Sequence, residues 1–333
     1  MHDGYSLHNR CSMYEGNDLH DGNTVLVIVG PTASGKTALS VEAALAFGGE
    51  VISADSMQIY RRMDIGTAKP TVAERRGIPH HLMDMVNPDQ PFSVADWQTA
   101  AVTAIREIAG RGQLPIVAGG TGLYVNSLIH NLNFSEVTAD PAYRAALQLM
   151  AETEGVLAVH AQLASCDPES AGRIHPNNLV RVIRTLEVVH ATGEPMSVHH
   201  ERSRTIPSPW HFILFGLLSD RPVLYERIDR RVEHMLEAGL AEEVRNLLQD
   251  GYGMELQAMQ GIGYKELAAH FAGQCKMEEA VLRIQQGSRN YAKRQITWFS
   301  RLAGLRWMDP ATRDMAGLLH ELAKALESSP DIE

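Results

Sequence analysis

Apolar and polar positions follow two patterns along the chain, short continuous apolar runs and longer amphipathic stretches. Four runs, at 24–29, 50–54, 115–119 and 211–218, have the length of strands buried on both faces. The stretches between them carry apolar residues at helical spacing. Strands that alternate with helices predict an α/β fold with a mostly parallel sheet.

Helix-boundary residues define several of the helices. Ser93 can cap a helix over 94–109, and Asp140-Pro141 can open another. Residues 178–193 predict a third helix, which follows an N-cap asparagine and ends at a glycine. After the fourth strand the pattern is wholly helical, up to a final helix near 277–303.

A glycine-framed loop follows the first predicted strand. Its sequence "GPTASGKT" fits G-x-x-x-x-G-K-S/T between a strand and a helix, the context that this phosphate-binding motif requires. Backbone N–H groups of such a loop surround an anion at the positive end of the following helix. Because the loop recognises charge rather than the bond that breaks, the reaction stays open. The predicted phosphate-binding residues are Gly30, Pro31, Thr32, Ala33, Ser34, Gly35, Lys36 and Thr37, with Thr37 as a Mg²⁺ ligand.

The predicted elements divide the chain into a core, an insertion and two terminal segments. The core is a P-loop NTPase-like parallel sheet flanked by helices, made of residues 24–136 and 209–310 with a helical C-terminal part. A helical excursion between the third and fourth strands predicts an inserted helical subdomain over 137–208. We expect a disordered extension over 1–23 and a tail over 311–333.

Composition limits the class of protein. A chain of 333 residues with 44% hydrophobic content can bury a large core. No apolar run approaches the roughly 20 residues that span a bilayer, and the N-terminus fits neither a signal nor a transit peptide. Three distant cysteines argue against zinc and disulfides and favour a reducing cytoplasm. The adjacent pairs His80-His81 and His199-His200 are a poor zinc site, because adjacent side chains rarely point at one ion.

Two polar stretches follow predicted strands at the sheet edge where parallel strands end. Asp55, in "SADSMQIY", is a candidate base, although a helix cap or an outer magnesium ligand explains the residue equally. "VAGGTGLY" places Thr121 among glycines that let the backbone approach a ligand, although a plain turn needs no function.

Seven separated motifs occur along the chain in one order. They are "GPTASGKT", "DSMQIY", "MDIGTAKP", "GGTGLY", "RIHPNN", "GIGYKE" and "KRQITWF". Together they closely resemble the tRNA dimethylallyltransferases, the isopentenyl transferases that modify the adenine beside the anticodon. The resemblance covers residues 24–308 and leaves both ends of the chain outside.

The resemblance implies transfer of a dimethylallyl group from its diphosphate to the exocyclic amine of the adenine 3′-adjacent to the anticodon, in tRNAs reading codons that begin with U. Asp55 matches the family's general base and Thr121 a residue that orients the site. Arg231 resembles the arginine at the diphosphate, although Arg227 or Arg230 could take that place. The P-loop would hold the leaving group with Mg²⁺ as cofactor. The adenine must be flipped out to enter a closed cleft.

A net charge of −10 requires the chain to concentrate its cations if it binds RNA. Residues 281–306 hold six cations and no acidic residue, although a solvated helix face is the ordinary explanation of such a run. In place of the arginine common after "TWF" this chain has Ser300, which leaves that phosphate contact open. The residues predicted to contact tRNA are Asp55, Ser56, Met57, Gln58, Thr121, Arg144, Val180, Arg181, Arg184, Gly263, Tyr264, Lys265, Lys293, Arg294, Gln295 and Thr297.

Three other functions compete with tRNA modification. An adenylate isopentenyltransferase shares the chemistry but has a mononucleotide acceptor, and a P-loop nucleoside or nucleotide kinase shares the loop and the sheet. A non-catalytic RNA-binding module would leave the P-loop unexplained. We prefer the interpretation as a tRNA-modifying enzyme, because it gives a role to both the insertion and the basic run. We expect a cytoplasmic monomer that contacts no membrane.

Overall fold

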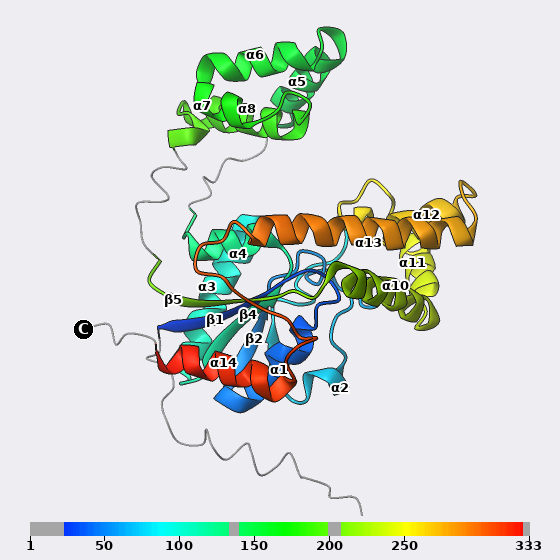
Figure 1. Ribbon diagram of the computed structural model, residues 1–333. Helices are drawn as coiled ribbons and strands as arrows, with labels where there is room; N and C mark the ends of the chain where they lie inside the picture. Colours follow the sequence, from blue (N-terminus) through cyan, green and yellow to red (C-terminus); the bar gives the residue numbers. More distant parts are fainter. Residues whose placement is uncertain (1–22, 133–139, 199–207, 329–333) are drawn as a thin grey trace, which may run out of the picture. The chain divides into compact units, whose positions relative to one another are not determined.

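One parallel sheet organises the larger part of the chain (Figure 1). The structure is a computed structural model that describes residues 23–132, 140–198 and 208–328. Within those residues six strands pair in the order β3-β2-β4-β1-β5-β6, and each pairing is parallel. The strands are β1 (Thr24–Val29), β2 (Gly49–Ser53), β3 (His80–His81), β4 (Leu114–Gly119), β5 (His211–Leu217) and β6 (Arg306–Met308).

The predicted α/β class with a P-loop-like parallel sheet is confirmed. Each of the four expected strands is present, with ends within one residue of the expected ones. β1 lies at the centre, and all of its residues are buried between β4 and β5. The edge strand β3 and the last strand β6 were not predicted, because two and three residues are too short to show an apolar run.

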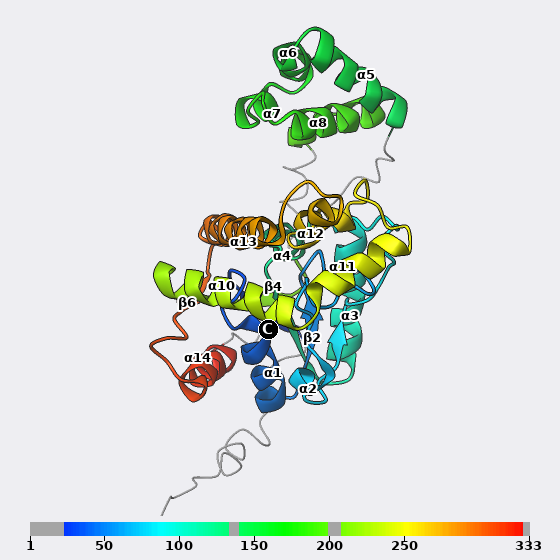
Figure 2. The same ribbon diagram turned by 90° about the vertical axis from the view of Figure 1, so that its right-hand side faces the viewer.

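Helices cover both faces of the sheet. α1 (Lys36–Phe47) and α14 (Met315–Glu327) pack together on one face, and α3 (Val94–Gly110) lies on the other (Figures 1 and 2). The predicted cap of α3 is present, since Ser93 and Asp96 form a reciprocal capping box. The other helices joined to this sheet are α2 (Val72–Arg75), α4 (Gly122–Ile129), α10 (Arg221–Glu237), α11 (Leu240–Gln249), the 3₁₀ helix η3 (Ala258–Gln260), α12 (Tyr264–Phe271) and α13 (Met277–Phe299).

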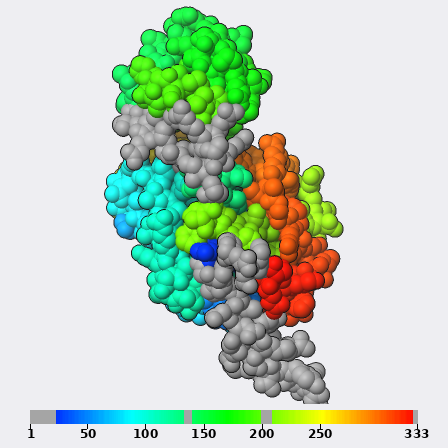
Figure 3. Space-filling view, turned by 90° about the vertical axis from the view of Figure 1, so that its left-hand side faces the viewer, coloured from blue at the N-terminus to red at the C-terminus, as the bar shows by residue number. Residues whose placement is uncertain are grey.

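The helix α14 corrects the expectation of a tail over 311–333. Leu318 and Leu322 are buried in the same apolar cluster as Leu39 and Phe47 of α1. Figure 3 shows α14 (red) forming part of the compact surface of the core. The expectation was wrong because the recognised motifs end before this helix, although its leucines have helical spacing.

A second compact unit comprises residues 127–208 and is built from helices alone within its described part. Its core contains Leu147, Val159, Leu163 and Leu186. The predicted insertion begins ten residues later, at 137. Residues 1–22 of the extension predicted over 1–23 lie outside the described residues, as does His199-His200. The helices are α5 (Pro141–Thr153), α6 (Val156–Cys166), α7 (Pro168–Arg173) and α8 (Leu179–Thr192).

A substitution in α14 tests whether this helix belongs to the core. We expect Leu322→Ala to lower the free energy of unfolding by about 2–5 kcal/mol, because it removes a fully buried side chain and leaves a cavity. His320→Ala, at an exposed position of the same helix, should change it by less than about 0.5 kcal/mol. Urea unfolding measures both values. Equal stability of the two variants would show that α14 is detached from the core.

Candidate active site

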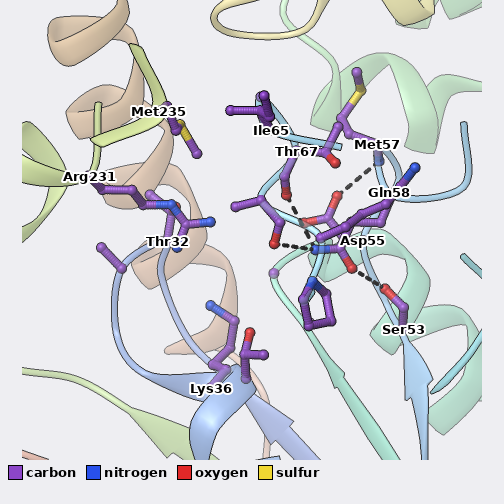
Figure 4. A pocket seen from close by; sticks show the side chains of 18 of the residues that line it. Thr32, Lys36, Ser53, Asp55, Met57, Gln58, Ile65, Thr67, Arg231 and Met235 are labelled. Carbon is purple, nitrogen blue, oxygen red and sulfur yellow. Dashed lines mark hydrogen bonds between the residues drawn. The ribbon is translucent and has the colours of Figure 1, made fainter. Parts of the chain in front are cut away.

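A cavity of about 980 Å³ lies where β1, β2 and β4 end. Parallel sheets of this kind bind ligands at the carboxyl ends of their strands. Figure 4 shows Lys36 and Arg231 on one side of the cavity and Asp55 on the other. Ile65 and Met235 add apolar surface above them. The cavity thus combines cations, a carboxylate and an apolar wall.

The loop after β1 has the backbone shape of an anion cradle. Gly30 has a φ of 149°, and a Cβ there would lie 2.5 Å from the carbonyl oxygen of Leu217. Gly35 has a φ of 93° and precedes α1, whose first turn has no side-chain cap. The N–H groups at this helix start are therefore available to a bound anion, where the helix dipole is also favourable.

Two partly buried cations face the cavity from different elements. The Lys36 ammonium donates to the Pro31 carbonyl oxygen at 2.6 Å, and the residue is partly accessible. Burial, and then the charge of Arg231, lower the pKa of Lys36 to about 7, against the opposing effect of Asp55. Burial also lowers the pKa of the Arg231 guanidinium. Both groups would gain from a polyanion that replaces their lost hydration.

Arg231 is the arginine of α10 that lines the cavity. Of the two alternatives, Arg227 donates to the Ser219 hydroxyl at 3.3 Å, and Arg230 forms an exposed ion pair with Glu226. Neither alternative reaches the cavity lining. The geometry therefore favours Arg231 among the three candidates.

Asp55 and Thr121 are brought together although 66 positions separate them. The Asp55 Oδ1 atom accepts the Met57 N–H at 2.9 Å, which closes a tight turn after β2. The Thr121 hydroxyl accepts the Ser56 N–H at 2.9 Å. A Cβ on Gly119 would lie 2.2 Å from the carbonyl oxygen of Ala54, so glycine is required where these two strand ends meet.

Gln58 is fixed within its own wall of the cavity. The Ser53 hydroxyl donates to Gln58 Oε1 at 2.8 Å, and Gln58 Nε2 donates to the carbonyl oxygens of Thr67 and Ala68 at 3.3 Å each (Figure 4). The side chain therefore joins the end of β2 to the loop over 64–71. Its polar atoms are used within the chain, which does not fit the predicted tRNA contact.

Gln295 of α13 links the phosphate-binding loop to the turn after β4. The Thr32 N–H donates to Gln295 Oε1, and Gln295 Nε2 donates to the Gly120 carbonyl oxygen, each at 2.9 Å. A Cβ on Gly120 would lie 2.1 Å from that amide nitrogen. The side chain is 5% exposed. Gln295 is therefore a structural link, and we withdraw it as an RNA contact.

Tyr291, one helical turn before Gln295, completes this side of the cavity. Its hydroxyl interacts with the Thr121 and Gln295 side chains. Burial and the nearby Asp55 carboxylate raise the pKa of Tyr291 to about 12, so the hydroxyl stays a donor at neutral pH. The sequence prediction missed this residue. A helical wheel of α13 would have found it, because cavity-lining positions recur at Ile284, Ser288, Tyr291 and Gln295.

Comparison with known proteins gives a family for this arrangement. The IPP transferase profile matches residues 58–302, and an Isopentenyl transferase profile matches residues 23–87. The chain is 50% identical to the tRNA dimethylallyltransferase of Acetivibrio thermocellus over 287 residues, which cover 86% of this chain and 92% of the relative. It is 48% identical to the enzyme of the same name from Bacillus subtilis over 286 residues, 86% of this chain and 90% of that relative. The chain belongs to the IPP transferase family.

Solved structures extend this likeness to three dimensions. The full-length tRNA isopentenylpyrophosphate transferase of Bacillus halodurans is 44% identical, with a TM-score of 0.69 over 92% of this chain and 97% of that one. A eukaryotic dimethylallyltransferase acting on tRNA is 30% identical, with a TM-score of 0.81 over 93% of this chain and 81% of that one. This IPP transferase therefore shares both sequence and fold with tRNA-modifying enzymes.

The "GIGYKE" segment of this IPP transferase contains residues that line the cavity and residues that lie inside the protein. Tyr264 is 1% exposed, and its hydroxyl donates to the Glu243 carboxylate at 2.6 Å, so we withdraw Tyr264 as an RNA contact. Gly263 and Lys265 line the cavity, and the Lys265 ammonium lies 3.8 Å from Glu266. Only these two stay candidates in the segment.

The insertion presents one cation without an ion pair in the part of it that the structure describes. Arg144 forms a bidentate pair with Glu187, at 2.9 and 2.8 Å, and Arg184 lies 3.7 Å from the same carboxylate. Arg181 is exposed beside Val180, which is 80% exposed. The structure thus leaves Arg181 as the cation of this set whose charge is unshared.

The basic run on α13 is weaker than its sequence predicts. Arg283 pairs with Glu279 of the preceding turn, and Arg289 pairs with Asp229 of α10. The sequence of residues 281–306 could not show these ion pairs. Glu279 lies just before that range, and Asp229 lies 60 positions before Arg289. The exposed predicted RNA contacts that stay on α13 are Lys293, Arg294 and Thr297.

The low pKa of Lys36 predicts a pH-dependent affinity for anions. Above about pH 7 the free ammonium loses its proton, whereas a bound diphosphate favours the charged form. Binding then takes up a proton, so affinity for inorganic diphosphate falls by up to about tenfold per pH unit above that value. In Lys36→Arg the affinity for diphosphate should not fall in this way, because the guanidinium stays charged. Calorimetric titration at several pH values measures the diphosphate affinity of both proteins. The ionisation of diphosphate itself affects both equally, so it cancels in their difference. The same pH dependence in both proteins would contradict the prediction.

Proposed function

We propose that this chain transfers a dimethylallyl group from dimethylallyl diphosphate to the exocyclic amine of the adenine 3′-adjacent to the anticodon, in tRNAs reading codons that begin with U. The observation that carries the proposal is one cavity in which the cations Lys36 and Arg231 face the Asp55 carboxylate. Cations suit a leaving diphosphate, and a carboxylate suits the proton of an attacking amine. The tRNA-modifying relatives support the choice of acceptor.

The donor would lie with its diphosphate on the loop after β1. Negative charge grows on the diphosphate as its bond to the allylic carbon breaks, and the loop N–H groups, Lys36 and Arg231 can stabilise that charge. The dimethylallyl carbon chain is apolar. Ile65 and Met235 offer it a wall of matching character beside the cations.

Mg²⁺ fits this donor site as a cofactor. Thr37 is exposed at the first turn of α1 and can give one hydroxyl oxygen, while diphosphate oxygens and waters supply the rest of an octahedral shell. Among the described residues no group of three His, Cys, Asp or Glu side chains could hold a metal alone. When bound, the ion would add charge stabilisation at the leaving diphosphate.

The acceptor would be placed by Asp55 on the opposite wall. The amine of adenine is a weak nucleophile because its lone pair is delocalised into the ring. In the described part of the chain Asp55 Oδ1 accepts the Met57 N–H, and Oδ2 accepts no hydrogen bond, so Oδ2 can take the amine proton during attack. Thr121 fixes the orientation of this turn through the Ser56 N–H.

The tRNA itself would be held by a small number of exposed cations. We propose Lys265, Lys293 and Arg294 near the cavity and Arg181 in the insertion. Each carries an exposed charge, and phosphate contacts of this kind supply most of the affinity for nucleic acids. No helix in the described residues meets the length and apolarity of a membrane span. A monomeric state and a cytoplasmic location stay predictions.

Replacing Asp55 tests the proposed base. We expect Asp55→Asn to slow single-turnover prenylation of tRNA by at least about 10²-fold while tRNA affinity changes little, because an amide cannot accept the amine proton. Asp89→Asn, which alters an exposed carboxylate outside the cavity, is the matched control. A variant rate within about threefold of wild type would exclude Asp55 as the base.

Wild-type protein that prenylates AMP rather than tRNA would support the adenylate alternative, and ADP release would support a kinase.

Removing exposed charges from α13 tests the RNA surface. We expect the double variant Lys293→Ala and Arg294→Ala to weaken tRNA binding and to reduce the slope of log affinity against log salt by about 0.7–0.9 per lost phosphate contact. Arg283→Ala on the same helix should change the slope less, because Arg283 is already paired with Glu279. Filter binding over a salt series measures all three proteins. An unchanged slope in the double variant would mean that this face is only solvated.

A further inference from the structure

The Glu243 carboxylate lies outside the cavity and binds a turn that forms part of the cavity wall. Glu243 Oε2 of α11 accepts the N–H groups of Asp64 and Ile65 at 2.9 and 2.8 Å. Glu243 Oε1 accepts the N–H of Gly66 at 3.2 Å. Three successive backbone N–H groups thus converge on one anion, the arrangement by which loops elsewhere bind phosphates. Here the anion belongs to a helix 177 to 179 positions further along the chain.

A second donor completes the set around this carboxylate. The buried Tyr264 hydroxyl donates to Glu243 Oε1 at 2.6 Å. Burial, and then the charge of Glu243, raise the pKa of Tyr264 well above its usual value, so the hydroxyl keeps its proton. A Cβ on Gly66 would lie 2.5–2.6 Å from the Tyr264 ring, so the ring can press against the loop only because this position is glycine.

The bound turn carries groups that face the reaction. Ile65 lies in the apolar wall, with Gly66 and Thr67 beside it in the cavity lining. The Thr67 carbonyl oxygen accepts from Gln58, three positions after Asp55 in the same tight turn. The hydrogen bonds of Glu243 therefore reach the donor wall directly and the Asp55 turn through one further side chain.

We infer that Glu243 is a positioning residue, which holds the loop over 64–67 so that the apolar wall for the prenyl chain and the turn of Asp55 keep their places. This inference rests on the proposed function. Glu243 does not belong to the cavity lining, so it acts through the loop rather than on a substrate. It also explains why α11 and α12, which follow β5 in sequence, are bound to the loop between β2 and β3.

The charge of Glu243 and not only its shape is needed in this arrangement. Four donors share two oxygen atoms, and each oxygen accepts two hydrogen bonds. An amide in the same place has one oxygen and one NH₂ group, so two of the four donors would face hydrogens. Glu243→Gln should therefore release part of the loop without removing any apolar packing. Glu243→Asp keeps the charge and should restore part of the effect.

Amide hydrogen exchange tests the contact itself. In Glu243→Gln we expect the amides of Asp64, Ile65 and Gly66 to exchange about tenfold faster or more, because their bonds to a charged group are lost. Glu242→Gln is the matched control, since Glu242 is exposed on the same helix and pairs with Arg245. Exchange that is unchanged in Glu243→Gln would overturn the inference, and this readout does not depend on which reaction the protein catalyses.

Steady-state kinetics with tRNA and dimethylallyl diphosphate then separate positioning from mere stability. We expect Glu243→Gln to raise KM for the donor and to lower kcat, about tenfold to hundredfold in kcat/KM, with an unchanged melting temperature and tRNA affinity. Partial recovery in Glu243→Asp supports the inference. A variant with wild-type kinetics, or one whose loss follows only a lower melting temperature, would overturn it. An inactive wild type would instead count against the proposed function.

Discussion

The amide of Gln295 is the contact that makes one site out of two loops. One loop, after β1, can hold an anion, and the other, after β4, supports the Asp55 turn through Thr121. Gln295 joins the two loops through their backbone atoms, the Thr32 N–H and the Gly120 carbonyl oxygen. An amide suits the task because it offers an acceptor and a donor at opposite corners, and here it uses Oε1 for Thr32 and Nε2 for Gly120.

The charges in the cavity are arranged for a ligand rather than for stability. Lys36 and Arg231 are both partly buried, and burial is the largest cause of the lowered pKa of each. Among the described residues neither cation forms an ion pair with a carboxylate that would offset its lost hydration. The Asp55 charge raises the pKa of both cations, but its effect is smaller than that of burial. Cations that lose hydration without an ion-pair partner destabilise the free protein, so two of them at one side of a cavity indicate an anionic ligand.

The sequence predicted the elements of the sheet better than the contacts between distant parts. Continuous apolar runs gave β1, β2, β4 and β5, and the G-x-x-x-x-G-K-S/T spacing gave the phosphate-binding loop. β3 and β6 are too short for any periodic signal. Motif likeness named Gln295 and Tyr264 as RNA contacts, but it could not distinguish exposed from buried members of a motif, because burial depends on tertiary packing.

The same limit explains why the helical C-terminal part was underestimated. Ion pairs such as Arg289 with Asp229, and the bonds of Glu243 to a loop near residue 65, join positions whose proximity no local pattern records. Four elements after β5 contribute to the site in this way, namely α10 with Arg231, α11 with Glu243, α12 with Tyr264 and α13 with Gln295. The sheet supplies the loops that meet the substrates, and these later helices fix where the loops stand. A P-loop on such a sheet can serve many reactions, so the helices that brace it are where this fold becomes specific to one.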